Sequence, residues 1–95
     1  MERTASEMEL EELELELGLL AERLGIEVRH VRYEGGGGLC VIRGKRVLMV
    51  NDLADRAERA ATIAAALAEA PELDQMYVVP EVRRFIETCA EEGSG

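Results

Sequence analysis

The spacing of apolar residues changes along this chain, and each change marks a predicted element. Between residues 7 and 24, leucines stand three and four positions apart, the spacing of one helix face: Leu10, Leu13, Leu17, Leu20 and Leu24. Leucine and glutamate, which fill this segment, are both good helix formers. The pattern therefore predicts a helix that stops at Gly25, because glycine is a common residue just after a helix end.

Two apolar runs, residues 39–42 and 47–50, predict a β-hairpin. Gly44 between them suits the first central position of a two-residue type II′ turn, which would pair Arg43 with Arg46. Since side chains alternate along a strand, one face would carry Leu39, Val41, Leu48 and Val50, and the other Cys40, Ile42, Val47 and Met49. Both faces are apolar, so we expect both to be covered, either by helices of this chain or by a second copy.

The other segments predict one more strand and two more helices. Residues 26–33 read as a strand with a change of phase near its middle, which indicates a bulge or an edge position. Residues 55–70 form an alanine-rich helix with a capping-box start and Pro71 beyond its end, and a last helix begins at Pro80. The predicted fold is α+β, with three antiparallel strands and an optional short fourth at 77–79, packed with three helices in the order α-β-β-β-α-(β)-α.

A length of 95 residues predicts one domain, which we place at residues 7–90. Residues 1–6 and 91–95 are polar and are predicted to be a disordered N-terminus and a disordered tail. No segment reads as a signal peptide or a membrane span, so we expect a cytoplasmic protein that does not bind membranes. The two cysteines are then expected to be reduced.

Charge is unevenly distributed along the chain. The net charge is −9, yet residues 25–50 hold five basic and two acidic residues, a local charge of +3. The negative overall field disfavours binding to nucleic acid. The basic segment, together with the Gly35–Gly38 loop, is a candidate contact for an anion or an acidic partner; its residues are Arg29, Arg32, Gly36, Gly37, Arg43, Lys45 and Arg46. The alternative is that these charges are solvated or paired with the acidic helices.

The sequence shows no arrangement of residues that predicts catalysis. His30 is the only histidine, and its spacing from Cys40 and Cys89 does not match a zinc site. Cys40 as a nucleophile would need His30 as its base, and a cysteine flanked by apolar residues is usually inert. The glycine run lacks the Lys-Ser/Thr pair of a phosphate-binding loop. We therefore expect no enzymatic activity, no metal and no cofactor.

Four short motifs resemble the N-terminal half of ImmA/IrrE-type metallopeptidases over residues 19–69. They are Leu24-Gly25-Ile26, Gly38-Leu39, Val50-Asn51 and Thr62-Ile63-Ala64. Where that family carries His-Glu-x-x-His, this chain has Ala65-Ala66-Leu67-Ala68-Glu69. The resemblance thus implies a degenerate zincin-like scaffold without the zinc ligands or the general-base glutamate.

These patterns predict a protein-interaction domain that forms a homodimer or binds another protein. The leucine stripe of the first helix has two interpretations, packing on its own sheet or pairing with a second chain. The candidate self-association residues are Leu10, Leu13, Leu17 and Leu20. The alternative function is a small-molecule or anion-binding module that uses the Gly35–Gly38 loop and the nearby basic residues.

Overall fold

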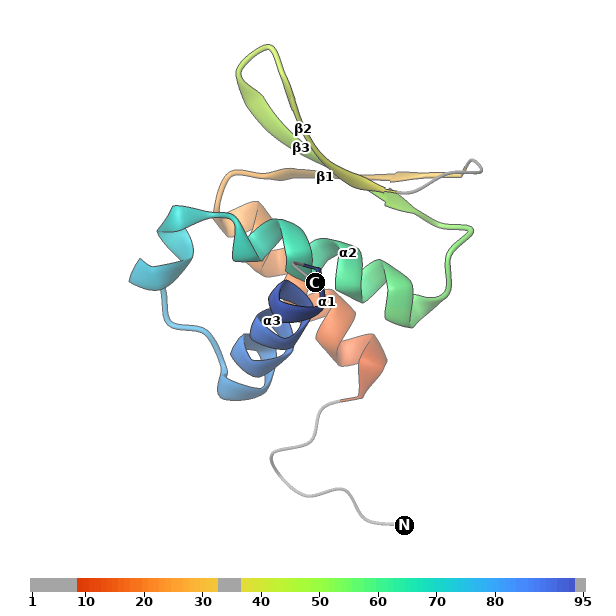
Figure 1. Ribbon diagram of the computed structural model, residues 1–95. Helices are drawn as coiled ribbons and strands as arrows, with labels where there is room; N and C mark the ends of the chain where they lie inside the picture. The colour runs from red at the N-terminus through yellow and green to blue at the C-terminus, as the bar shows by residue number, and fades with distance from the viewer. Residues whose placement is uncertain (1–8, 33–36, 94–95) are drawn as a thin grey trace.

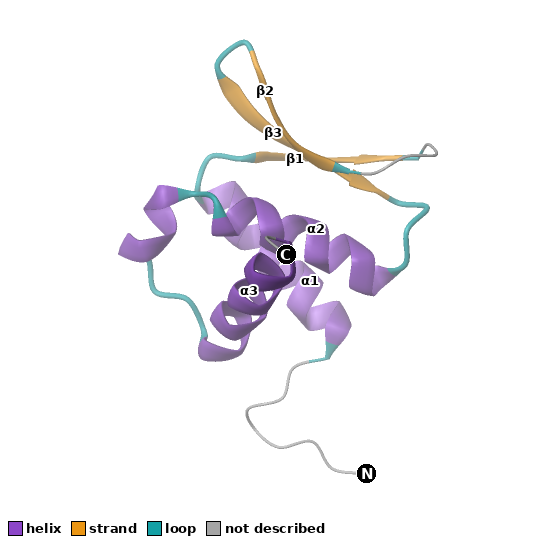
Figure 2. Ribbon diagram, viewed as in Figure 1, coloured by secondary structure: helices purple, strands orange, loops and turns teal. Residues whose placement is uncertain are grey.

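The computed structural model describes residues 9–32 and 37–93, which form three α-helices, a short 3-10 helix and three strands. Their order is α1 (Leu10–Arg23), β1 (Glu27–Val31), β2 (Gly38–Ile42), β3 (Lys45–Asn51), α2 (Arg56–Ala68), η1 (Pro71–Gln75) and α3 (Pro80–Gly93). Figure 2 shows the helices and the strands in separate layers. The predicted α+β class and the three predicted helices are confirmed.

Local hydrogen bonds explain where α1 ends and where α2 begins. Gly25, with φ at 83°, follows α1, and the Ile26 N–H donates to the Ala21 carbonyl oxygen at 3.0 Å. This is the Schellman arrangement, in which a left-handed residue lets the chain satisfy the last helical carbonyls. At the start of α2, the Asp55 side chain accepts a hydrogen bond from the Glu58 N–H at 2.9 Å, as the capping pattern predicts.

The sheet is mixed, so the prediction of a purely antiparallel sheet is wrong. Its strand order is β1-β3-β2, with β3 antiparallel to β2 and parallel to β1. The central position of β3 buries Val47, Leu48 and Val50 between two neighbouring strands. That burial favours β3, rather than β2, in the middle of the sheet.

The hairpin turn also differs from the prediction. Its central residues are Arg43 and Gly44, with φ at 54° and 79°, so the turn is of type I′ rather than type II′. Ile42 therefore pairs with Lys45, and Cys40 pairs with Val47. The centre of the turn is Arg43-Gly44 rather than the predicted Gly44-Lys45. Each residue of β2 therefore pairs two positions away from its predicted partner on β3, so the predicted register is wrong. An even shift keeps every side chain on its predicted face.

The helices cover only one face of the sheet, so of the two predicted covers, helices of this chain or a second copy, the described helices supply one face alone. Figure 1 shows α1, α2 and α3 on the same side of the three strands. Leu39, Leu48 and Val50 face the helices, while Cys40, Ile42, Val47 and Met49 lie on the other face. No helix within the described residues covers that second face. Val47 is nevertheless only 1% exposed, since it is central and flanked by Glu27 and Cys40.

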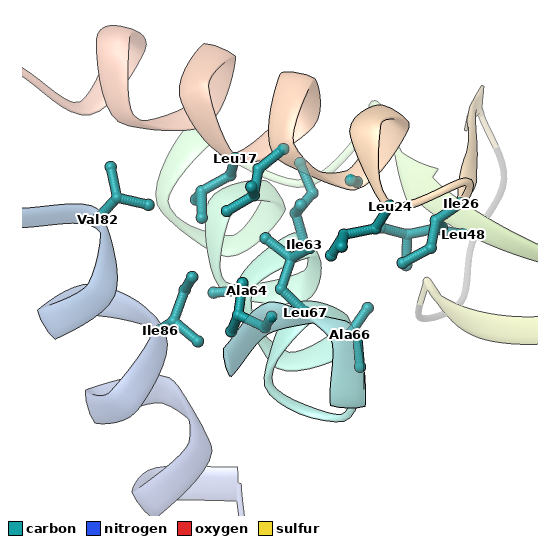
Figure 3. Close-up of a cluster of buried hydrophobic side chains, with 14 of the residues drawn as sticks. Leu17, Leu24, Ile26, Leu48, Ile63, Ala64, Ala66, Leu67, Val82 and Ile86 are labelled. Carbon is teal, nitrogen blue, oxygen red and sulfur yellow. The ribbon is translucent and has the colours of Figure 1, made fainter. Parts of the chain in front are cut away.

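The core lies between the sheet and the helices. In Figure 3, Leu17 from α1, Leu48 from β3, Ile63 and Leu67 from α2, and Ile86 from α3 point into one apolar cluster. Full burial of each large aliphatic side chain contributes about 1.5–3 kcal/mol. The three helices and the sheet therefore depend on one shared core.

This core uses most of the leucine stripe of α1. Leu13, Leu17 and Leu20 are at most 8% exposed and contact residues of the same chain. Leu10, at 38%, is the only one of the four candidate self-association residues that is exposed. Leu13, Leu17 and Leu20 therefore pack within the chain, and of the four predicted self-association residues only Leu10 remains on the surface.

The segment after α2 contains a 3-10 helix rather than a fourth strand. Residues 77–79 have no strand pairing, although Val78 is buried at 7% exposure. Pro80 begins α3 as predicted, and the helix continues to Gly93, past the predicted domain end at residue 90. The predicted disordered segment 1–6, and residues 94 and 95 of the predicted tail, lie outside the described residues.

Candidate functional site

Two of the predicted anion-binding cations share one carboxylate on the face away from the helices. The Arg29 Nε donates a short hydrogen bond to Glu27, and the Lys45 Nζ lies 3.7 Å from the same side chain. The hydrogen bond from Arg29 is the main cause that lowers the pKa of Glu27, and it raises the pKa of Arg29. An incoming anion would have to compete with Glu27 for both cations.

Arg46, another of the predicted contact residues, forms its contacts on the face of the sheet that carries the helices. Its guanidinium donates to both carboxylate oxygens of Glu72, at 3.1 and 3.0 Å, and to the Leu24 carbonyl oxygen at 2.6 Å. The hydrogen bond from Arg46 lowers the pKa of Glu72. This bidentate contact ties the hairpin to η1 and to the end of α1.

The remaining predicted contact residues do not complete an anion site. Arg32 follows β1 at the end of the sheet where β3 finishes, whereas Arg43 lies in the turn that precedes β3. Gly36 lies outside the described residues, and Gly37 lies against the backbone of Met49. The structure thus distributes the predicted basic residues over both faces and both ends of the sheet.

His30 and Cys40 do not form a catalytic pair, because β3 separates their strands. His30 lines a groove on the helix side, with its Nδ1 2.9 Å from the Asp52 Oδ1, while Cys40 is exposed on the opposite face. Burial raises the pKa of the Cys89 thiol, which favours its unreactive protonated form.

The described residues contain neither a candidate metal cluster nor a membrane-spanning helix. No group of three or more His, Cys, Asp or Glu side chains in residues 9–32 and 37–93 could hold a metal ion. Within the same ranges, no helix combines the length and the apolar character needed to cross a membrane.

One exposed apolar surface of the described chain is the free edge of β2. Val41 is 66% exposed and Ile42 is 42% exposed, and the two side chains point to opposite faces of the strand. In Figure 1 the turn end of the hairpin extends past the helices, and no helix among residues 9–32 and 37–93 covers it from either side. Two large apolar side chains on an edge strand, which pairs with β3 on one side only, form a surface that favours a partner.

The two edge strands of the sheet differ in how they are protected. β1 carries three ionisable residues, Glu27, Arg29 and His30, among its five, and pairs with β3 in unbroken register. β2 reads Gly-Leu-Cys-Val-Ile and carries no charge at all. Charged side chains on an edge discourage pairing with another chain. β2 is therefore the edge that remains open to an additional strand.

A groove of about 490 Å³ runs beside the start of β2, between this strand, α2 and the end of α3. Its α2 wall is formed by small side chains, including Ala61, Thr62 and Ala65. Three glutamates line it as well, Glu58, Glu69 and Glu92. The groove thus combines a wall that allows close approach with a negative charge.

A second apolar patch lies on α1. Leu15 is 62% exposed and Leu19 is 46% exposed, and both line a groove of about 390 Å³ next to β1. Glu11 and Glu22 line this groove too. The patch is comparable to the β2 edge in side-chain exposure, but it adjoins the charged edge of the sheet.

No known protein family matches this chain, and no curated protein or solved structure matches it either. The function must therefore be inferred from the surface of the chain itself. Sequence reasoning identified the two-faced apolar hairpin but missed that β2 would be an edge strand. The contrast between the charged residues of β1 and the uncharged β2 was the available signal.

Proposed function

We propose that this chain is a non-catalytic protein-interaction domain that forms a homodimer through its β2 side. The observation that carries the proposal is the exposure of Val41 and Ile42 on a strand with an open edge. Covering such side chains contributes about 25 cal/mol for each Å² of apolar surface removed from water. A partner at this edge would also satisfy backbone groups that otherwise bond only to water.

The groove beside β2 supports the non-catalytic part of the proposal. On the resemblance to ImmA/IrrE-type metallopeptidases, the His-Glu-x-x-His positions correspond to Ala65, Ala66 and Glu69. All three residues line this groove. In that comparison, the place of the metal site is a small-residue surface, suited to contact with a protein segment rather than to metal-assisted hydrolysis.

The proposal is tested by the mass of the protein in solution. Sedimentation equilibrium and light scattering at micromolar concentration should give a species of twice the 10.5 kDa chain mass, dissociating on dilution. The measurement should be repeated under reducing conditions, so that a disulfide between chains cannot account for the result. A monomer at every concentration would overturn the proposal.

A further inference from the structure

We propose that two copies of this chain join their β2 strands in antiparallel orientation, around a two-fold axis at Cys40. The two three-stranded sheets would then form one continuous sheet, ordered β1-β3-β2 and then β2-β3-β1 of the partner. The inference rests on the proposed function and adds to it the surface, the orientation and the register of the contact.

The hairpin turn determines which backbone groups of β2 face the open edge. A type I′ turn makes Ile42 and Lys45 a hydrogen-bonded pair, so the next such pair is Cys40 with Val47. The N–H and C=O groups of Cys40 and Ile42 thus point towards β3. Those of Leu39 and Val41, at the alternate positions, point to the free edge.

These directions restrict how a second β2 can pair. Residues that exchange hydrogen bonds must both point to the shared edge, so Leu39 and Val41 must pair with Leu39 or Val41 of the partner. An axis at Cys40 pairs Leu39 with the partner's Val41 and keeps all five residues of Gly38–Ile42 opposite one another. An axis at Leu39 or Val41 would satisfy the backbone rule but would shorten the overlap.

The same register covers the exposed side chain on the helix side of the sheet. Val41 points to the face that carries the helices, but it lies opposite Arg46, near the turn end of the hairpin. Next to the partner's Leu39, it would lie above the groove beside the partner's β2. The small residues of that groove, Ala61 and Ala65, allow a close approach.

Charge favours this antiparallel orientation. Antiparallel pairing brings the turn of one copy, with Arg43, to the Gly37 end of the partner's β2. The groove at that end is lined by Glu58, Glu69 and Glu92. Each copy would thus offer a basic hairpin turn and an acidic groove to the other, which offsets part of the repulsion between two chains of charge −9. A parallel arrangement would place the two basic turns side by side.

A contact of this kind is self-complementary and closes at two copies. Each β2 is used once, and the outer edges of the joined sheet would be two β1 strands with their charged residues. We therefore expect a dimer rather than a fibre.

The first test compares two variants that place the same charge on two apolar patches. Val41 and Leu15 have similar exposure, 66% and 62%, and their replacement by glutamate should leave each fold intact. Val41→Glu would put a charge next to the partner's Leu39, in a contact removed from water, and raise the dissociation constant about tenfold or more. Leu15→Glu should leave it within about twofold. Circular dichroism should show both variants folded.

The second test measures the register with the protein's own cysteines. Cys40 and the partner's Cys40 would form a non-hydrogen-bonded pair at the axis, with Cα atoms about 4.5 Å apart, close enough for a disulfide. The Cys89→Ser variant, oxidised with copper phenanthroline, should yield a covalent dimer within minutes, and the Cys40→Ser variant should not. Adding Val41→Glu to Cys89→Ser should slow the cross-linking.

The outcomes separate this inference from the proposed function. A dimer that survives Val41→Glu and forms no Cys40 cross-link would overturn the β2 contact while leaving self-association intact. Dissociation by Leu15→Glu alone would move the contact to α1 and overturn the inference in the same way. A wild-type chain that is monomeric at every concentration would overturn both.

Discussion

Gly37 lies so close to Met49 that a β-carbon on it would stand 2.3 Å from the Met49 carbonyl oxygen. It would also approach the Thr62 methyl group to 3.3 Å. Gly37 directly precedes β2 and lies between Met49 of β3 and Thr62 of α2. This close approach leaves no room for a side chain, so the position requires glycine. The neighbouring Gly38 has open space at the same position.

The Gly37→Ala variant should lose about 1–3 kcal/mol of unfolding free energy, because the backbone must shift to accept the methyl group. Gly38→Ala is the matched control and should change the unfolding free energy by about 0.5 kcal/mol or less. Urea unfolding at one fixed protein concentration measures both. Equal stabilities of the two variants would show that the close approach at Gly37 is not needed for the fold.

Replacing Arg43 by asparagine should stabilise the hairpin. Arg43 has φ at 54°, a left-handed conformation that costs most side chains free energy but that asparagine tolerates. Asn-Gly is the preferred type I′ pair, and we expect a gain of about 0.5–1 kcal/mol in urea unfolding. Arg43→Ala removes the same charge without the conformational benefit, so it should not be stabilised. A gain in both variants would trace the effect to charge instead.

Loss of the Arg46–Glu72 contact should change how stability depends on pH. Because Arg46 holds the pKa of Glu72 below its ordinary value of 4.5, the folded state binds fewer protons at this group than the unfolded state. Its contribution is therefore present above the ordinary pKa and is lost as the pH falls through the lowered pKa. Glu72→Gln should lower the urea midpoint at pH 7, and the difference from wild type should disappear in acid.

A matched control for this contact lies in the same helix. Asp74→Asn removes a like charge from η1 without removing a partner of Arg46, and it should lower the midpoint at pH 7 less than Glu72→Gln does. A difference between wild type and Glu72→Gln that stays constant down to pH 3 would contradict the assignment.

The leucines of α1 should divide into structural and surface residues. Leu17 is fully buried, and Leu17→Ala should cost about 2–5 kcal/mol through lost burial and the cavity left behind. Leu15→Ala, at an exposed position two residues away, should change stability by about 0.5 kcal/mol or less. Urea unfolding of both variants checks the assignment, and similar losses would contradict the burial of the stripe within one chain.

Much of the fold followed from local patterns. The stop at Gly25, the cap at Asp55 and the start of α3 at Pro80 are each determined by one or two residues and their neighbours. The type I′ turn was missed because arginine seldom adopts positive φ, so Arg43 did not indicate a left-handed residue at this position. The even period of the strands nevertheless kept each side chain on the predicted face.

Strand order was harder to predict, because it depends on distant contacts. Nothing local to residues 27–31 shows that β1 pairs parallel with β3 and leaves β2 at the edge. The predicted contact residues depended on that order. With β2 at the edge, Val41 and Ile42 are exposed. Leu13, Leu17 and Leu20 of α1 are core instead of a contact surface.

β3 pairs with β2, its neighbour in the sequence, and with β1, which lies farther away in the sequence. This arrangement has a consequence for folding during synthesis. β2 is joined to β3 by a two-residue turn, so this hairpin can form on its own within about microseconds. β1 leaves the ribosome earlier, yet it has no strand to pair with until β3 is complete. During synthesis, β1 is therefore without its partner strand until β3 has been made, and its charged residues, Glu27, Arg29 and His30, discourage pairing with another chain in that interval.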